Sequence, residues 1–187
     1  MITKPFWVPA ITVIYLLAAE TPEALILTAL FFGWIGDLLL MRGRKSWFIA
    51  GAFSFLIGHI FYIIVFIRSS GGIEVFIQHP IFSILMLLPY IGFLLFMRKL
   101  FGHNVKSVLL AAGFYLSILM LMSYCSLMRV WVLPISEFLP TFMGSLLFIA
   151  SDSLIGYRNF KRKVRGIGTL IVATYIAAQL LIITGLA

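Results

Sequence analysis

Apolar residues fill most of the chain in long runs that short polar segments separate. The runs cover residues 5–19, 23–41, 47–67, 79–97, 106–128, 138–157 and 166–185. Each run approaches the ~20 residues that a helix needs to cross the hydrocarbon core of a bilayer. Because the runs are continuous and do not alternate as barrel strands do, the pattern predicts an all-α polytopic bundle of about seven transmembrane helices.

Composition agrees with this class and limits the number of domains. Hydrophobic residues make up 63% of the 187 positions, charged residues 11%, and the mean hydropathy is +1.13, far from the mixture of a soluble domain. We expect a single integral membrane domain over residues 1–187. The first run also resembles a signal peptide, with Lys4 before it and Ala18 and Ala19 at its end, but the second run follows at once, which favours a retained helix.

Charged residues predict the topology. Basic residues gather in the loops after the second, fourth and sixth runs: Arg42, Arg44, Lys45, Arg98, Lys99, Lys106, Arg158, Lys161, Arg162, Lys163 and Arg165. The other loops hold Glu20, Glu23, Glu74 and Glu137 with only Arg68 and Arg129. The positive-inside rule places the basic loops and the N-terminus in the cytoplasm and the C-terminus outside, in the plasma (inner) membrane if the source is bacterial.

The formal charge of +8 is therefore mostly topological, and it also suits contact with anionic membrane lipids. No basic cluster has the length or the interleaved aromatic residues of a nucleic-acid site, so no nucleic-acid partner is expected.

Two aspartates, Asp37 and Asp152, lie inside apolar runs. A charge at the centre of a spanning helix costs roughly 2.5 to 3.5 kcal/mol on insertion scales, so such residues are functional candidates by default. The alternative is a structural ion pair with an arginine about one turn away, such as Arg42 or Arg158.

Other polar residues fall on glycine-bearing helix faces at spacings of three, four, seven and eight. These faces hold Gly33, Gly36 and Asp37; Gly51, Phe55, Gly58, His59 and Tyr62; Gly144, Phe148, Ser151 and Asp152; and Gly168, Tyr175 and Gln179. Small residues mark helix contacts in membranes, so we expect these faces to meet around a pocket open to the inner leaflet, with His59 and Gln179 deeper than the aspartates. An equally open interpretation is that the tyrosines and Gln179 only join helices through hydrogen bonds.

Motifs for several other chemistries are missing from the sequence. No His, Cys or acidic pair has metal-ligand spacing on one helix, and neither a Gly-x-Ser-x-Gly elbow nor a phosphate loop occurs. The single cysteine, Cys125, cannot form an intrachain disulfide. We expect neither a metal nor an organic cofactor.

Five short motifs occur in order along the chain. They are Lys4-Pro5, Gly-Asp-x-x-Leu at residues 36–40, Phe-x-x-Gly-His-x-x-Tyr at 55–62, Gly-x-x-Leu-Phe-x-x-Ser-Asp at 144–152 and Tyr-x-x-Ala-Gln at 175–179. Together they resemble the YhhN-like lysoplasmalogenases, integral membrane enzymes that cleave the vinyl ether bond of lysoplasmalogens. Members commonly carry an additional helix before the Lys-Pro motif, which leaves open whether a second protomer or lipid completes this bundle.

The resemblance implies an ether hydrolase that acts on a lysophospholipid substrate, with Asp37 and Asp152 as a proton donor and an anion in either order. Residues that would position the ether oxygen, the glycerol hydroxyl or water are His59, Tyr62, Tyr115, Ser151, Tyr175 and Gln179. Basic residues at the inner mouth that would hold the phosphate are Arg42, Arg158 and Lys161.

Two other functions remain open at this point. Intramembrane Asp and His residues also mark proton paths, so a small proton-coupled transporter is one alternative. Pro89 is the one helix-breaking proline near the middle of a run, and the sequence shows no repeat of the kind that transporters use. A noncatalytic lipid-binding protein is the other alternative.

Overall fold

The computed structural model describes residues 4–101, 106–160 and 166–187, and every regular element within them is a helix. The predicted all-α class is confirmed. The elements are α1 (Lys4–Ala18), α2 (Ala24–Leu40), α3 (Lys45–Ser69), α4 (Glu74–Gln78), α5 (Pro80–Phe101), α6 (Lys106–Met128), the 3-10 turn η1 (Arg129–Trp131), α7 (Ile135–Phe160) and α8 (Ile167–Thr184).

Each predicted run corresponds to one long helix, and the short α4 was not predicted. Five of the described helices, α3 and α5 to α8, are long and apolar enough to cross a membrane. The helices α1 and α2 are apolar but have only 15 and 17 residues. The number of spans and their orientation therefore stay predictions.

Two antiparallel helix pairs form the centre of the bundle, and glycine lets each pair pack closely. In the α2–α3 pair, a Cβ built on Gly58 would lie 3.0 Å from the carbonyl oxygen of Ala29. In the α7–α8 pair, a Cβ built on Gly144 would lie 2.7 Å from the carbonyl oxygen of Ala178. The distance at Gly144 is too short for a side chain and the distance at Gly58 is tighter than most Cβ contacts, so these glycines allow the two backbones of each pair to approach closely.

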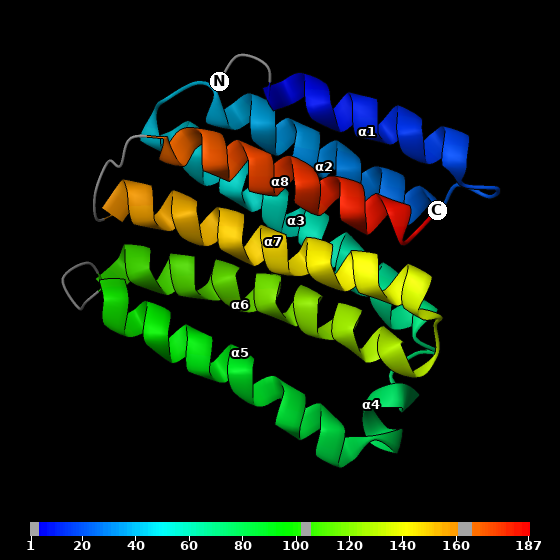
Figure 1. Ribbon diagram of the computed structural model, residues 1–187. Helices are drawn as coiled ribbons and strands as arrows, with labels where there is room; N and C mark the ends of the chain where they lie inside the picture. Colours follow the sequence, from blue (N-terminus) through cyan, green and yellow to red (C-terminus); the bar gives the residue numbers. More distant parts are fainter. Residues whose placement is uncertain (1–3, 102–105, 161–165) are drawn as a thin grey trace.

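The remaining helices surround these two pairs (Figure 1). Helix α6 contacts both α3 and α7, so it lies beside the junction of the pairs. Helix α1 packs on α2 and α8 at one edge, and α5 packs on α6 at the other edge. The polar faces of α2, α3, α7 and α8 are consequently enclosed by helices.

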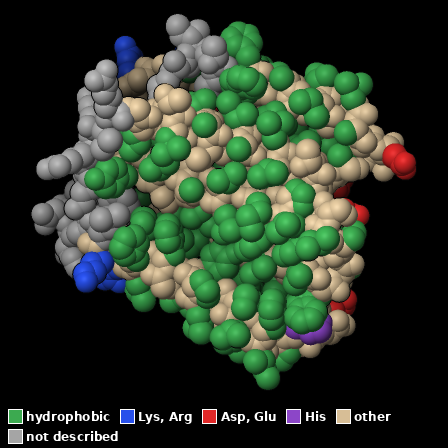
Figure 2. Space-filling view, viewed as in Figure 1, with side chains coloured by type: hydrophobic (Ala, Val, Ile, Leu, Met, Phe, Trp, Pro, Cys, Tyr) green, Lys and Arg blue, Asp and Glu red, His purple; other side chains and the backbone are tan. Residues whose placement is uncertain are grey.

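Charged residues separate to the two ends of the bundle, with apolar side chains between them (Figure 2). The α2–α3 loop and the adjoining ends of α5 and α7 lie at one end, here called the basic end. The α1–α2 loop with Glu23 and the first turns of α4 and α7, with Glu74 and Glu137, lie at the other, the acidic end. The prediction that the basic loops share one face is thus met for the described residues. Lys161, Arg162, Lys163 and Arg165 lie outside the described residues.

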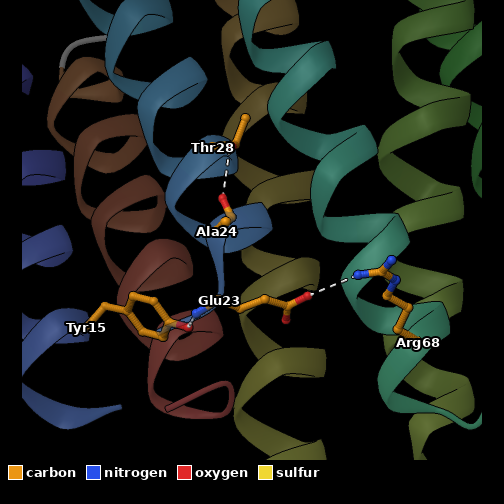
Figure 3. Close-up of polar contacts among 5 residues, drawn as sticks. All are labelled: Tyr15, Glu23, Ala24, Thr28 and Arg68. Atoms are coloured by element: carbon orange, nitrogen blue, oxygen red, sulfur yellow. Dashed lines mark hydrogen bonds and ion pairs between the residues drawn. The ribbon is translucent and has the colours of Figure 1, made fainter. Parts of the chain in front are cut away.

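Polar contacts tie α1, α2 and α3 together at the acidic end (Figure 3). The backbone N–H of Glu23 donates to the Tyr15 hydroxyl at 2.9 Å. The Glu23 carboxylate lies 3.6 Å from the guanidinium of Arg68, and these side chains are 40% and 69% exposed. Because both groups are solvated, this ion pair contributes little to stability.

Candidate active site

Asp37 is fully buried near the basic end of α2. Its Oδ2 accepts a hydrogen bond of 2.9 Å from the hydroxyl of Tyr175, a buried residue of α8. At ~1.5 Å per residue, Asp37 lies about 5 Å from the last residue of α2. A carboxylate therefore enters the interior of the bundle and receives a donor from a different helix pair.

Asp152 repeats this arrangement on the other side of the junction. It is half-buried on α7, and its Oδ2 accepts a hydrogen bond of 2.5 Å from the hydroxyl of Tyr115 on α6. Helix α7 continues to Phe160, so Asp152 lies about 12 Å from the end of its helix at the same rise. Both carboxylates are in the half of the bundle nearer the basic end, as predicted.

Aromatic rings connect the two aspartate–tyrosine pairs. The ring centroid of His59, on α3, lies 5.9 Å from that of Tyr115 and 5.1 Å from that of Phe148. The Phe148 ring in turn lies 5.7 Å from the ring of Tyr175. The rings of His59 and Phe148 thus form a chain of contacts from the tyrosine of the Asp152 pair to the tyrosine of the Asp37 pair.

The two nitrogens of His59 have different surroundings. The backbone carbonyl of Phe55 is a hydrogen-bond partner of the imidazole, and Nε2 is buried with no hydrogen-bond partner among the described residues. The bonded nitrogen is therefore Nδ1, which donates its proton to the carbonyl. This arrangement fixes the neutral tautomer that has an acceptor lone pair on Nε2.

A second hydrogen bond between the helix pairs lies deeper in the bundle. The hydroxyl of Tyr62 donates to Oε1 of Gln179 at 2.9 Å, and both residues are buried. The absence of a side chain at Gly33 makes room for Gln179 and Tyr175, because a Cβ at Gly33 would lie 3.3 Å from Nε2 of Gln179 and 3.8 Å from the Tyr175 hydroxyl. The structure thus brings together the predicted residues of α2, α3 and α8.

The model of the YhhN family matches residues 1–186, which is essentially the whole chain. The chain belongs to the YhhN family. This is the lysoplasmalogenase family, so the resemblance of the sequence motifs is confirmed. No curated protein and no solved structure matches the chain. The family and the long apolar helices are consistent with an integral membrane protein.

Three further predicted residues of this YhhN protein take no part in the two aspartate–tyrosine hydrogen bonds described above. Ser151 is buried and donates to the carbonyl oxygen of Ile171 at 3.1 Å, which joins α7 to α8. Arg42 is exposed at the basic end, with its guanidinium 4.5 Å from the Trp47 ring centroid. Arg158 is half-buried near the end of α7, and Lys161 lies outside the described residues.

Apolar hollows occur on the described surface of this YhhN protein. One, of about 600 Å³, lies between α1 and α2, and another, of about 430 Å³, lies at the basic end of α2 beside Arg42. Neither hollow is lined by Asp37 or Asp152. The described residues contain no cluster of His, Cys, Asp and Glu suited to a metal ion.

Proposed function

We propose that this protein hydrolyses the vinyl ether bond of lysoplasmalogens and releases a fatty aldehyde and a glycerophospho-headgroup alcohol. Membership of the YhhN family supports the reaction class. The observation that carries the assignment of residues is that Asp37 and Asp152 are each bonded to a tyrosine hydroxyl, and that the rings of His59 and Phe148 connect the two tyrosines. The interior around them is otherwise mainly apolar.

The reaction needs one proton donor and one anion. A carboxyl group transfers its proton to the β-carbon of the vinyl ether, and the resulting oxocarbenium ion adds water to give a hemiacetal. The hemiacetal then breaks down to the aldehyde and the alcohol. Two carboxyl groups in one desolvated site do not both ionise readily, so one can donate while the other stays ionised and stabilises the cation, as in glycosidases.

His59 is suited to the water step. Its Nδ1 proton is used by the Phe55 carbonyl, so Nε2 can only accept a hydrogen bond. A water held there would stand between the two carboxylates. His59 then orients this water toward the oxocarbenium carbon and takes up its proton as the hemiacetal forms.

Differences in burial suggest the side from which substrate approaches. Asp37 and Tyr175 are fully buried, whereas Asp152 and Tyr115 are half-buried. The vinyl ether would reach the site past α6 and α7, with its hydrocarbon chain along the apolar helices. The phosphate would then lie at the basic end, where Arg42 and Arg158 can bind it.

The test is incubation of the purified protein with an alkenyl lysophospholipid and, separately, with the saturated ether of the same chain length. We expect aldehyde from the vinyl ether alone, because a saturated ether has no double bond to protonate. Turnover of neither lipid would reject the proposal. Proton-driven uptake into liposomes without aldehyde would favour the transporter.

A further inference from the structure

Arg129 is a charged residue in the interior that the proposed mechanism does not use. It follows α6 in the turn η1 at the acidic end, and its side chain is only 2% exposed. The exposed carboxylate of Glu137 acts on its charge, but within the described part of the chain no carboxylate forms a direct ion pair with it. A buried cation that lacks a direct ion pair is costly unless other groups replace its hydration.

Groups from three other helices surround the guanidinium. Nη1 donates to Oγ1 of Thr141 on α7 at 2.5 Å, and Nη2 donates to the carbonyl oxygen of Gly185 at the end of α8 at 3.2 Å. The ring of Phe66, on α3, lies 5.3 Å from the central carbon of the guanidinium. Arg129 therefore joins both helix pairs from the end of α6.

The contact with α8 has an electrostatic basis. The last carbonyl groups of a helix have no partner inside the helix and carry the negative end of its dipole. Gly185 is the residue that ends α8. Its carbonyl oxygen thus offers Arg129 a partial negative charge, while Phe66 offers the face of an aromatic ring.

One polar atom of the guanidinium has no partner among the described residues. Nε of Arg129 is buried and unbonded, and so is Oγ of Ser126, three residues earlier on the same helix face. Side chains at this spacing are neighbours on a helix. Both atoms therefore lie on the buried side of this segment.

The position of α8 is fixed closely at the same end. A Cβ on Gly185 would fall within contact distance of the carbonyl oxygen of Glu137 and 3.1 Å from the backbone nitrogen of Thr141. From Gly185 to Gln179 and Tyr175 is about 9 and 15 Å along α8 at ~1.5 Å per residue. A helix transmits an axial shift over such a length, and a shift of ~1 Å would break the 2.9 Å bond from Tyr175 to Asp37.

We propose that Arg129 is a positioning residue that holds α8 in the register at which Tyr175 meets Asp37 and Gln179 meets Tyr62. Its role in turnover rests on the proposed function. Arg129 lies at the opposite end of the bundle from the predicted phosphate contacts, so it acts through α8 and not on the substrate.

A double-mutant cycle of Arg129→Met with Tyr175→Phe tests this role. We expect Arg129→Met alone to lower kcat about tenfold or more while KM changes less than about threefold, because misplacement affects the chemical step. In the Tyr175→Phe background the same change should lower kcat by no more than about threefold, because coupled residues give non-additive effects. Arg129→Lys, which keeps the charge but reaches one acceptor, should restore part of kcat.

Arg68→Met is the matched control, since Arg68 is at the same end but is 69% exposed, and its effect should add independently to that of Tyr175→Phe. If Arg129→Met does not fold, Thr141→Val takes its place in the double-mutant cycle. Thr141→Val removes one hydrogen-bond acceptor of Arg129 with little change of side-chain shape.

The midpoints of thermal unfolding give a second readout that needs no turnover. If wild-type protein releases no aldehyde, the proposed function fails, whereas non-additive midpoints for Arg129→Met and Tyr175→Phe would still support the inference. Additive effects of Arg129 and Tyr175 in every readout that is measurable would overturn it.

Discussion

At the scale of single residues, the site combines buried carboxylates with tyrosine donors. A buried carboxylate needs a hydrogen bond to offset its lost hydration, and tyrosine supplies one hydroxyl on an otherwise apolar ring. Tyr115 and Tyr175 come from different helices, yet each reaches one aspartate. The two aspartates therefore have the same kind of partner but differ in burial, and this difference in surroundings suits the acid and anion roles that we propose for them.

His59 offers a prediction at this scale, since Asn can replace Nδ1 of histidine and Gln can replace Nε2. If Nε2 holds the attacking water, His59→Gln should keep more activity than His59→Asn. We expect His59→Asn to lose about a hundredfold in kcat, the usual effect of removing a general base. Initial rates of aldehyde release measure the activity of both variants. Equal rates for the two variants, or a better Asn variant, would contradict a role for Nε2.

The sequence predicted some of this site. Glycine on the faces of Asp37, His59 and Asp152 indicated that these residues face other helices, and all lie at least partly inside the bundle. It did not predict which tyrosine bonds which aspartate, because that depends on which helices are neighbours. The sequence places Arg129 among the loop charges and does not predict its burial, because its contact with the end of α8 depends on how the helices pack.

At the scale of the elements, glycine allows close packing within two helix pairs, α2–α3 and α7–α8. The hydrogen bonds from Tyr175 to Asp37 and from Tyr62 to Gln179 lie between the pairs. Close backbone contact within each pair fixes the helix spacing, and the bonds between the pairs fix their relative position. The site is thus a junction, and its geometry depends on packing at residues that take no part in the chemistry.

Gly144→Ala tests this packing, because its Cβ would meet the backbone of α8 at 2.7 and 3.0 Å. Overpacking of this kind costs typically about 1–3 kcal/mol, so the thermal unfolding midpoint should fall. Gly92→Ala is the matched control on α5, where nothing lies within 4 Å of the new atom, and alanine favours a helix over glycine. Equal midpoints for the two variants would refute close packing at Gly144.

The pattern of apolar runs predicted the ends of the long helices to within a few residues, because each of these helices coincides with one continuous apolar run. The main differences are α4 (Glu74–Gln78), which was predicted as a loop, and the extension of α7 from the predicted 138–157 to Ile135–Phe160. Both differences fall outside the apolar runs, where hydropathy gives no signal. The sequence also did not predict which helices are neighbours, because several helices carry glycine on a polar face and any of them could pack together.

At the scale of the whole molecule, the two ends differ in charge and the site lies nearer the basic end. The positive-inside rule predicts that this end faces the cytoplasm. Substrate would then enter from the inner leaflet, with its phosphate near Arg42 and Arg158.

Cysteine labelling tests this orientation. Ser46 is exposed at the basic end and Ser136 at the acidic end. In cells with an intact membrane, an impermeant maleimide should label Ser136→Cys, and it should label Ser46→Cys only after permeabilisation. The parent protein, whose Cys125 is buried, gives the background. The reverse pattern would show that the basic end and the proposed site face outward.

The central claim is that Asp37 and Asp152 act together on one vinyl ether, and kcat of their asparagine variants measures this most directly. We predict that Asp37→Asn and Asp152→Asn each lower aldehyde release by about a hundredfold or more, and that the double variant is little worse, because catalytic groups that act as a unit are non-additive. Glu74→Gln, at an exposed acid at the other end, should keep full activity. A folded Asp37→Asn or Asp152→Asn protein with activity within a few-fold of wild type would contradict the pair.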